Sequence, residues 1–150
     1  MYDEIAKGYD RLHKEEQLDK LKIIAQYFKP KALMLDLGCG TGIAMDYFDV
    51  DSVGIDPSLE LLKLGKGNRV CCYAENLPFK DDSFSSVICL TAVHHMDVDL
   101  VIKEVKRVCK GDVCFSVLKK AAKSDEIVKK LVEAFELKII EEKKDFILFK

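Results

Sequence analysis

The sequence predicts an α/β fold: a three-layer, doubly wound, seven-stranded sheet that is mostly parallel and ends in an antiparallel C-terminal hairpin. Three observations predict it. An apolar run from Ala32 to Leu35 ends in Asp36 and a turn with glycines at 38, 40 and 42. Short strand-like runs then alternate with helical stretches, which is typical of parallel strands joined by helices. Two strand-like runs separated by charged residues close the chain, which indicates a hairpin at the sheet edge.

Apolar spacing and helix breakers define the elements of the first half. Apolar residues at helical intervals predict a helix over 15–28, which Pro30 stops. The apolar run that follows predicts a first strand to Leu37, and the chain beyond the glycines is expected to be helical through about Phe48. The next elements are expected in this order: a strand at 52–55, a leucine-rich helix at 58–65, a strand at 70–73, a polar loop at 76–83 and a strand at 86–90.

Capping residues define the elements of the second half. Asp97 can cap a helix whose apolar residues fall on one face, and Gly111 is expected to end that helix. Ser124 is expected to cap the last helix. The remaining strands are expected at 113–118, 137–140 and 146–149, the last two forming the hairpin.

Length and composition limit the class of protein. A chain of 150 residues is expected to form one domain, with residues 1–28 as an N-terminal helix that can act as a lid. Hydrophobic residues make up 49% and charged residues 33%, with a net charge of −2, which excludes a wholly basic nucleic-acid binder. No run approaches the ~20 apolar residues that span a bilayer. The N-terminus has no apolar signal region, so a cytoplasmic location is expected.

The cysteine pattern argues against disulfides and against a metal site. Cys71, Cys72, Cys89 and Cys114, four of the six cysteines, lie in apolar, strand-like runs. Buried free thiols in a reducing compartment are therefore expected. The sequence contains no C-x-x-C pair, so no structural zinc site is expected.

Two acids mark the ends of neighbouring strands. Asp36 ends the first predicted strand, and Asp56 ends the second, about 20 residues later. In doubly wound sheets the ligand lies beyond the carboxyl ends of the strands, and an acid at the second position accepts hydrogen bonds from both ribose hydroxyls. The carboxylate of Asp36 would repel a pyrophosphate at the glycine turn and would attract a cation. The two acids together indicate a nucleoside that carries a cationic group.

Two other interpretations of the glycine turn were weighed. Glycine-rich stretches occur in many ordinary loops, so the turn alone is weak evidence of a ligand site. A nicotinamide dehydrogenase is disfavoured, because Ile43 stands where a dinucleotide fingerprint has its third glycine and because Asp36 precedes the turn.

The ordered motifs resemble those of the class I S-adenosylmethionine-dependent methyltransferases, in particular the small single-domain type related to the ubiquinone and menaquinone methyltransferases. The resemblance covers nearly the whole chain. Its motifs are Tyr2-Asp3 and Tyr9-Asp10, LDLGCGTG at 35–42, GIDPS at 54–58, AENLPFKDDSF at 74–84 and SSVICLTAVHHM at 85–96. The series is specific for the superfamily and poorly specific for the substrate.

Carried over position by position, the resemblance implies S-adenosylmethionine as the cofactor and a set of binding residues. Asp36 and the backbone of Gly38, Cys39, Gly40, Thr41 and Gly42 would hold the methionine portion. Asp56, followed by Pro57, would bind the ribose, and Ala74 and Glu75 would meet the adenine. Leu90 would offer its carbonyl oxygen to the α-amino group, and Tyr9, with Tyr2 as a second candidate, would close over the sulfonium.

Two features depart from the family pattern. Tyr73 stands where an aspartate that contacts the adenine amine is often found, so Glu75 or backbone groups would have to replace that contact. The sequence also has no inserted cap after the fifth strand. The acceptor pocket is therefore expected to be formed by the N-terminal segment, the loop after the fourth strand and a contribution from a partner.

Methyl transfer from a sulfonium mainly requires alignment of the reacting atoms, and a general base helps with some acceptors. His94 and His95 stand at the expected strand end, and His95 is the preferred candidate base. The alternative is that a histidine here packs against the cofactor or a helix. Asp97 is expected to serve as a helix cap.

The acceptor remains open at the level of the sequence. Lys119, Lys120 and Lys123 follow the fifth strand and could attract an anionic acceptor such as RNA, although a solvated loop is the simpler interpretation. The segment 91–96 is also similar to that of tRNA wobble-uridine methyltransferases. A small-molecule acceptor is the leading hypothesis. The alternatives are a tRNA or protein acceptor, with an activating subunit, and a cofactor-binding scaffold without turnover.

Overall fold

The computed structural model describes residues 2–150, with side chains described from Arg11 onward. Its seven strands form one sheet in the order β3-β2-β1-β4-β5-β7-β6. The strands are β1 (Met34–Leu37), β2 (Ser52–Asp56), β3 (Asn68–Cys71), β4 (Phe84–Leu90), β5 (Cys109–Leu118), β6 (Lys138–Glu141) and β7 (Asp145–Phe149). The first five strands pair in parallel, whereas β7 runs antiparallel to both β5 and β6. The predicted fold class is therefore confirmed.

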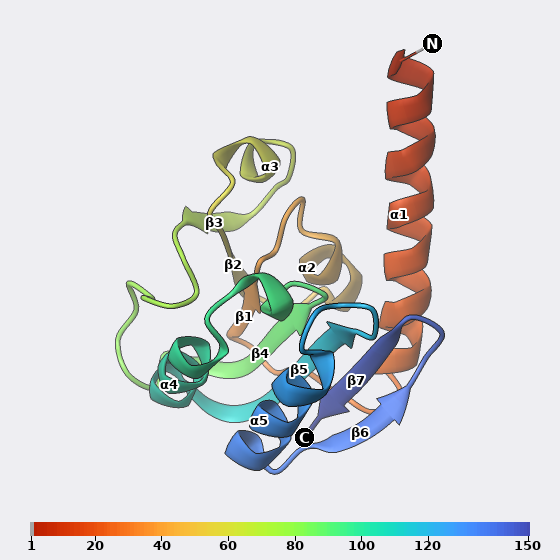
Figure 1. The fold of residues 1–150 in the computed structure, drawn as a ribbon. Helices are drawn as coiled ribbons and strands as arrows, with labels where there is room; N and C mark the ends of the chain where they lie inside the picture. The colour runs from red at the N-terminus through yellow and green to blue at the C-terminus, as the bar shows by residue number, and fades with distance from the viewer. Residues whose placement is uncertain (1) are drawn as a thin grey trace.

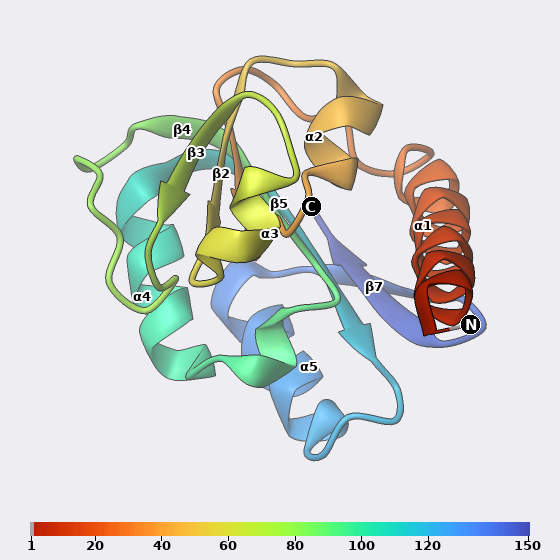
Figure 2. The same ribbon diagram turned by 90° about the horizontal axis from the view of Figure 1, so that it is seen from above.

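Helices cover both faces of the sheet, as Figures 1 and 2 show. They are α1 (Tyr2–Ile24), α2 (Ile43–Phe48), α3 (Leu59–Lys63), the short 3-10 helix η1 (Val93–His95), α4 (Val98–Val108) and α5 (Ser124–Phe135). Helices α1 and α2 contact each other on one face, and α4 and α5 contact each other on the opposite face. The result is the three-layer arrangement that the alternation of strands and helices predicts.

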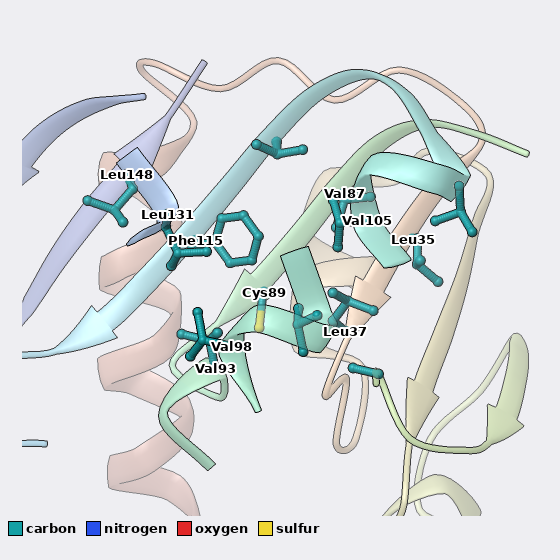
Figure 3. Close-up of a cluster of buried hydrophobic side chains, with 14 of the residues drawn as sticks. Leu35, Leu37, Val87, Cys89, Val93, Val98, Val105, Phe115, Leu131 and Leu148 are labelled. Carbon is teal, nitrogen blue, oxygen red and sulfur yellow. The ribbon is translucent and has the colours of Figure 1, made fainter. Parts of the chain in front are cut away.

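Alternating side chains of the strands build the two halves of the core. Leu35, Leu37, Val87 and Cys89 point toward α4 and α5, where Figure 3 shows them packed beside Phe115. Side chains one position along each strand belong to the other layer, in contact with α1 and α2: Met34, Ile88, Cys114 and Ile147. Because successive side chains of a strand point to opposite faces, Asp36, two residues after Met34, lies on the α1 side of the sheet.

Strand order reverses between β1 and β4. After β1 the chain moves outward through β2 and β3, and then it returns to the other side of β1 with β4 and continues to β5. Ligands of doubly wound sheets bind at the carboxyl ends of the strands at this point of reversal. The C-terminal part of α1 is buried against the sheet through Leu21 and Ile24, and Phe28 in the turn that follows belongs to the same cluster. The N-terminal part of α1 continues past the carboxyl ends of the strands (Figure 1).

Several element boundaries differ from the sequence prediction, those of α1 and β3 among them, and β4 and β5 begin earlier than predicted, at Phe84 and Cys109. Helix α1 begins at Tyr2 rather than at residue 15 and ends at Ile24, before the expected stop at Pro30. The turn after it has i to i+3 hydrogen bonds, from Gln26 N to Ile23 O and from Tyr27 N to Ile24 O. Strand β3 lies two residues earlier than predicted, because its register follows pairing with β2 rather than its apolar content.

Two predicted capping roles are wrong. Ser124 is the first residue of α5, and its hydroxyl donates to Lys119 O, while Lys123 occupies the N-cap position without a side-chain hydrogen bond. Gly111 does not end α4, because the chain passes directly from Val108 into β5. Gly111 instead lies at an irregularity in the pairing of β4 with β5, where a Cβ atom would come within 2.0 Å of Ser85 O. Asp97 does cap α4, with its side chain accepting from Leu100 N.

All six cysteines are free, as expected. Cys39, Cys89 and Cys114 are buried, but Cys71 is exposed because it ends the edge strand β3. Burial of Cys71 is thus a wrong prediction. None of the helices in residues 2–150 has the length and apolar content that crossing a membrane requires.

Candidate active site

A cavity of about 430 Å³ lies at the carboxyl ends of β1, β2 and β4, beside α1. It contains residues from both sides of the point where the strand order reverses. The lining residues are His13, Lys14, Gln17, Asp36, Gly38, Cys39, Gly40, Thr41, Ile43, Ala44, Asp56, Leu61, Leu64, Leu90, Thr91 and Ala92. Seven of the predicted cofactor-binding residues line this one cavity: Asp36, Gly38, Cys39, Gly40, Thr41, Asp56 and Leu90.

The glycine turn after β1 is held against the end of β2. Gly40 N donates to Asp56 Oδ2 at 3.0 Å, and Ser58 N donates to Asp56 Oδ1 at 2.8 Å. Gly38 has a φ of 69°, and a Cβ atom there would lie 2.8 Å from Ala92 Cβ. Only glycine fits this position, because it needs both the left-handed conformation and the close approach of the chain after β4.

Asp36 is the most unusual group in the cavity wall. Its side chain is 2% exposed, and its Oδ2 atom has no hydrogen-bond partner among the described residues. Burial raises the pKa of Asp36 to about 8, with a further increase from nearby Asp56 and an opposing effect of Arg69. A buried carboxyl with a free oxygen facing a cavity is matched to a cationic group, which would replace the missing solvation.

Arg69 was missed by the sequence analysis. It extends from β3 under the glycine turn and donates to two of its carbonyl oxygens, Gly40 O at 3.0 Å and Thr41 O at 2.8 Å. Its Nε donates to Lys66 O at 2.6 Å. Two hydrogen bonds from one guanidinium thus hold the turn, and the third holds the guanidinium itself. Arg69 is separated from both acceptor residues by 28 or more positions in the sequence, so only the folded structure shows that it contacts the turn.

A family model described as "Methyltransferase domain" matches residues 35–117, more than half of the chain. The chain belongs to the class I S-adenosylmethionine-dependent methyltransferases. S-adenosylmethionine is accordingly its cofactor. The unpaired carboxyl of Asp36 and the glycine turn suit the cationic amino-acid portion of that molecule.

Curated relatives of this methyltransferase differ in their named substrates. An uncharacterized protein of Methanocaldococcus jannaschii is 37% identical over 121 residues, covering 76% of this chain and 48% of that protein. A probable tRNA methyltransferase of Homo sapiens is 35% identical over 101 residues, covering 59% of this chain and 21% of the human protein. A ubiquinone/menaquinone biosynthesis C-methyltransferase of Geotalea daltonii is 26% identical over 164 residues, covering 93% and 70% of the two chains. The chain spans about half the length of the first of these relatives.

Solved structures confirm the fold of the methyltransferase. A possible histamine N-methyltransferase of Thermotoga maritima has a TM-score of 0.73 at 17% identity, covering 96% of this chain and 94% of that chain. A putative methyltransferase of Haloferax volcanii, in complex with the Trm112 methyltransferase activator, has a TM-score of 0.72 at 20% identity, covering 91% and 75%. Both similarities concern the fold alone.

Among the described side chains, the remaining predicted cofactor residues of the methyltransferase lie outside the cavity lining. Gly42 begins α2 with a φ of 90°, and Pro57 follows β2. Ala74 is buried, and Glu75 accepts from Asp97 N at 3.1 Å, which connects the loop after β3 to the start of α4. Tyr73 is 66% exposed. The backbone at Tyr2 and Tyr9 belongs to α1, but both side chains lie outside the described residues.

The rings of the two candidate bases, His94 and His95, contact each other in η1, with centroids 4.0 Å apart and planes tilted by 45°. His95 is exposed, whereas His94 is partly buried and has an Nδ1 atom without a partner among the described residues. Burial and the neighbouring His95 lower the pKa of His94, and the carboxylate of Asp145 opposes this effect. Neither ring lines the cavity, although both follow shortly after Thr91 and Ala92, which do.

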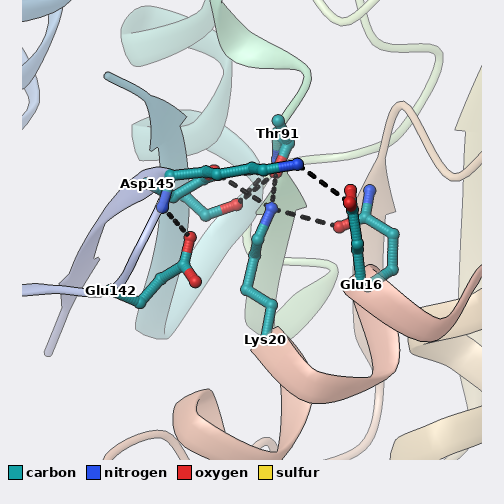
Figure 4. A network of polar contacts seen from close by, with 8 residues as sticks. Glu16, Lys20, Thr91, Glu142 and Asp145 are labelled. Carbon is teal, nitrogen blue, oxygen red and sulfur yellow. Dashed lines mark hydrogen bonds and ion pairs between the residues drawn. The ribbon is translucent and has the colours of Figure 1, made fainter. Parts of the chain in front are cut away.

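A buried polar network lies on the other side of the same cavity (Figure 4). Lys20 of α1 donates to Asp145 of β7 at 3.0 Å and to Thr91 at 2.7 Å. Gln17 and Thr91 belong both to this network and to the cavity lining. The sequence analysis did not identify Lys20 or Asp145, because they are 125 residues apart and neither belongs to a recognisable motif.

Proposed function

We propose that this methyltransferase transfers the methyl group of S-adenosylmethionine to a small molecule that enters between α1 and η1. The observation that carries the proposal is the unpaired, buried carboxyl of Asp36 in a cavity that also contains Asp56. This pair of acids at neighbouring strand ends suits a nucleoside with a cationic group. The proposal also includes the cytoplasmic location expected from the sequence.

The proposed cofactor contacts follow from the arrangement of the cavity. Asp36 accepts from the α-amino group together with the carbonyl oxygen of Leu90, and the glycine turn supports the methionine portion. Each carboxylate oxygen of Asp56 accepts one backbone N–H, which leaves each with capacity for one ribose hydroxyl. Ala74 and Glu75 are proposed to meet the adenine, and Tyr9 is proposed to close over the sulfonium.

The catalytic demand on the protein is small. When bound, S-adenosylmethionine supplies a methyl group that is already activated by the positive sulfur. The protein therefore has to orient the acceptor in line with that group and exclude competing water. His95 is proposed to take the proton of a hydroxyl, amine or acidic carbon, with His94 packed behind it.

A small acceptor, rather than RNA, is favoured by the contacts of a lysine in the loop after β5. Lys119, one of the three lysines that could attract RNA, lies 3.9 Å from Glu141 and over the ring of Phe146. Its charge is therefore partly neutralised within the chain.

Two alternatives each have a specific observation in their favour. The human relative named as a probable tRNA methyltransferase favours a tRNA acceptor. The Haloferax complex favours an activating partner subunit. A binding scaffold without turnover is the third possibility, and it predicts cofactor binding without transfer.

Thermal shift tests the cofactor assignment first. S-adenosylmethionine and S-adenosylhomocysteine are expected to raise the melting temperature, and NAD is not, because only ligands that bind the folded state stabilise it. Asp56→Ala should weaken cofactor binding by about 1–3 kcal/mol, since hydrogen bonds to a charged acceptor are lost. An unchanged dissociation constant would contradict the ribose assignment.

Labelled S-adenosylmethionine then tests the acceptor. The protein is incubated with a metabolite extract and, separately, with bulk tRNA, each with and without a candidate activator. Label in the extract supports the proposal, and label only in tRNA replaces it with the first alternative. Absence of transfer under every condition favours the scaffold. With an acceptor in hand, His95→Ala is expected to lower turnover and to leave cofactor affinity unchanged.

A further inference from the structure

Four polar side chains from four separate segments meet at the end of β4, and three of them are buried. They are Lys20 of α1, Thr91 after β4, Ser116 of β5 and Asp145 of β7. Asp145 is 0% exposed, Ser116 1% and Lys20 7%. Charged groups of this kind are seldom buried unless they are paired, so their presence beside a ligand cavity requires an explanation.

The hydroxyl of Thr91 is the centre of the network, as Figure 4 shows. Thr91 Oγ1 donates to Asp145 Oδ2 at 2.8 Å and accepts from Lys20 Nζ at 2.7 Å, with Ser116 Oγ at 3.0 Å as its third neighbour. The backbone N–H of Thr91 also donates to Ser116 Oγ, at 2.7 Å. One donor and two acceptor positions is the full capacity of a hydroxyl, so the side chain of Thr91 is completely used.

Thr91 also has a strained backbone. Its φ is 52°, in the left-handed region that β-branched residues rarely adopt. The residues on both sides, Leu90 and Ala92, line the cavity, and η1 with its two histidines begins directly afterwards. The left-handed turn at Thr91 therefore sets the direction in which the chain leaves β4 and passes along the cavity.

We infer that Lys20 and Asp145 are positioning residues for the cofactor cavity, which they shape by holding Thr91 in its left-handed conformation. The ion pair receives and donates the hydrogen bonds that compensate the strain at Thr91. By holding Thr91, the ion pair fixes the carbonyl of Leu90 and the start of η1. Its two members lie on α1 and β7, outside the family's glycine-turn motif. This inference rests on the proposed assignment of the cavity to S-adenosylmethionine.

A second consequence concerns α1. Lys20 connects α1 to the end of β4 through its hydrogen bond to Thr91. Gln17, one turn earlier, accepts a hydrogen bond from Lys20 at 3.2 Å and lines the cavity. The helix is thus connected to the cavity wall by hydrogen bonds as well as by the apolar contacts of Leu21 and Ile24. Docking of α1 and the shape of the cavity are coupled through Thr91.

A double-mutant cycle between residues 20 and 91 tests the inference. Lys20→Met and Thr91→Val both remove hydrogen bonds but retain the strain, so each is expected to weaken S-adenosylmethionine binding by about fivefold or more. Thr91→Gly removes the strain together with the hydroxyl, because glycine adopts positive φ freely, and should bind within about threefold of the wild type. In the Thr91→Gly background, Lys20→Met should then change the dissociation constant by less than about twofold.

The opposite pattern overturns the inference. If Lys20→Met weakens binding equally with threonine or glycine at position 91, or if Thr91→Gly is as damaging as Thr91→Val, the ion pair acts only on overall stability. Lys22→Met is the matched control on the same helix, because Lys22 is exposed and its ion pair with Asp19 is long, at 3.9 Å. It should leave binding unchanged.

Folding and ligand assignment are checked separately. If Lys20→Met does not fold, the neutral pair Lys20→Gln/Asp145→Asn replaces it in the same cycle, since it avoids an isolated buried charge. The backbone chemical shifts of residue 91 report its conformation without any ligand, and they should move in Lys20→Met but not in Lys22→Met. A wild-type protein that fails to bind S-adenosylmethionine contradicts the proposed function, whereas unmoved shifts at residue 91 contradict the positioning role.

Discussion

The two sides of the cavity are built in different ways. On the β1 and β2 side, the glycine turn, Asp36 and Asp56 lie within about 20 residues of one another, and Asp56 accepts hydrogen bonds from the backbone N–H groups of Gly40 and Ser58. On the β4 side, the wall depends on Lys20 and Asp145, which are 125 residues apart and are joined by side chains alone. The first side is a local motif, and the second side exists only in the folded chain.

This difference separates the tasks of the two sides. The side with Asp36 is built from residues that are close in sequence, and it is the side proposed to hold the amino-acid portion of S-adenosylmethionine. The side with Lys20 and Asp145 depends on contacts among α1, β5 and β7. A similar fold does not determine such long-range contacts, so the fold alone does not identify the acceptor.

The largest expected effect is on the stability of the assembled side. Asp145→Ala should lower the free energy of unfolding by about 3–5 kcal/mol, because it leaves the ammonium of Lys20 buried without its carboxylate. Urea denaturation measures the change. The control is Lys22→Ala, whose exposed ion pair with Asp19 should be worth no more than about 1 kcal/mol. A loss below that value in Asp145→Ala would show that the buried ion pair stabilises the fold no more than the exposed ion pair does.

The next effect is on the local side and concerns binding rather than stability. Asp36→Asn should weaken S-adenosylmethionine binding by about 1.5–3 kcal/mol, because the charged acceptor for the α-amino group is lost. Isothermal titration calorimetry measures it above pH 8, where the wild-type carboxyl is ionised. Unchanged affinity would show that Asp36 does not bind the α-amino group, and it would contradict the cofactor-binding role of the β1 and β2 side.

The raised pKa of Asp36 gives a third prediction, with a definite sign. The folded, ligand-free protein keeps the proton of Asp36 up to a pKa of about 8, whereas the unfolded chain releases it near about 4. Between these values the folded state binds more protons, so the free energy of unfolding falls as pH rises, by up to about 1.4 kcal/mol per pH unit. Asp36→Asn should lack this slope.

The same proton makes cofactor binding dependent on pH. The α-amino cation favours the ionised carboxylate of Asp36, so affinity should increase up to about pH 8 and should fall again above it, where the α-amino group of the cofactor loses its own proton. Calorimetry in buffers of different ionisation enthalpy should detect proton release below that pH. An identical pH profile in Asp36→Asn would assign the dependence to another group.

The smallest expected effect tests the support of the glycine turn. Arg69→Met removes the hydrogen bonds to Gly40 O and Thr41 O, so S-adenosylmethionine binding should weaken by about 1 kcal/mol. Removing the cation also takes away an influence that lowers the pKa of Asp36, so the pH profile should shift upward. Arg69→Lys keeps the charge but not the forked geometry, and it should restore the pH profile without restoring full affinity. Equal behaviour of the two variants would argue against the hydrogen bonds.

The success of the sequence analysis followed the range of the interactions. The strands, their parallel order and the cap Asp97 were predicted, because periodicity and capping act over a few residues. The wrong assignments, Gly111 and Ser124, concern places where a neighbouring strand or loop decides the local structure. Gly111 is needed for the approach of Ser85, which no local pattern in the sequence indicates.

The candidate site divides in the same manner. Seven of the predicted cofactor residues line one cavity, whereas Arg69 and Lys20 were missed. Each of these two cations donates two hydrogen bonds to residues of the cavity lining. Lysine and arginine are common on exposed helix and strand surfaces, so their residue type carries no information about burial or partners. Contacts between segments supply that information.

The sequence by itself determined the fold class and the identity of the two acids at the strand ends, and its resemblance to known methyltransferases indicated the cofactor. The fold class and the two acids follow from short-range geometry: a strand, a tight turn that needs glycine, and a charge placed at a fixed distance along the chain. The tertiary structure alone decided that Asp36 lacks a partner, that Arg69 supports the turn and that Lys20 and Asp145 hold Thr91. The physical reason is that burial, and the hydrogen bonds that must compensate it, depend on which distant segments the fold brings together.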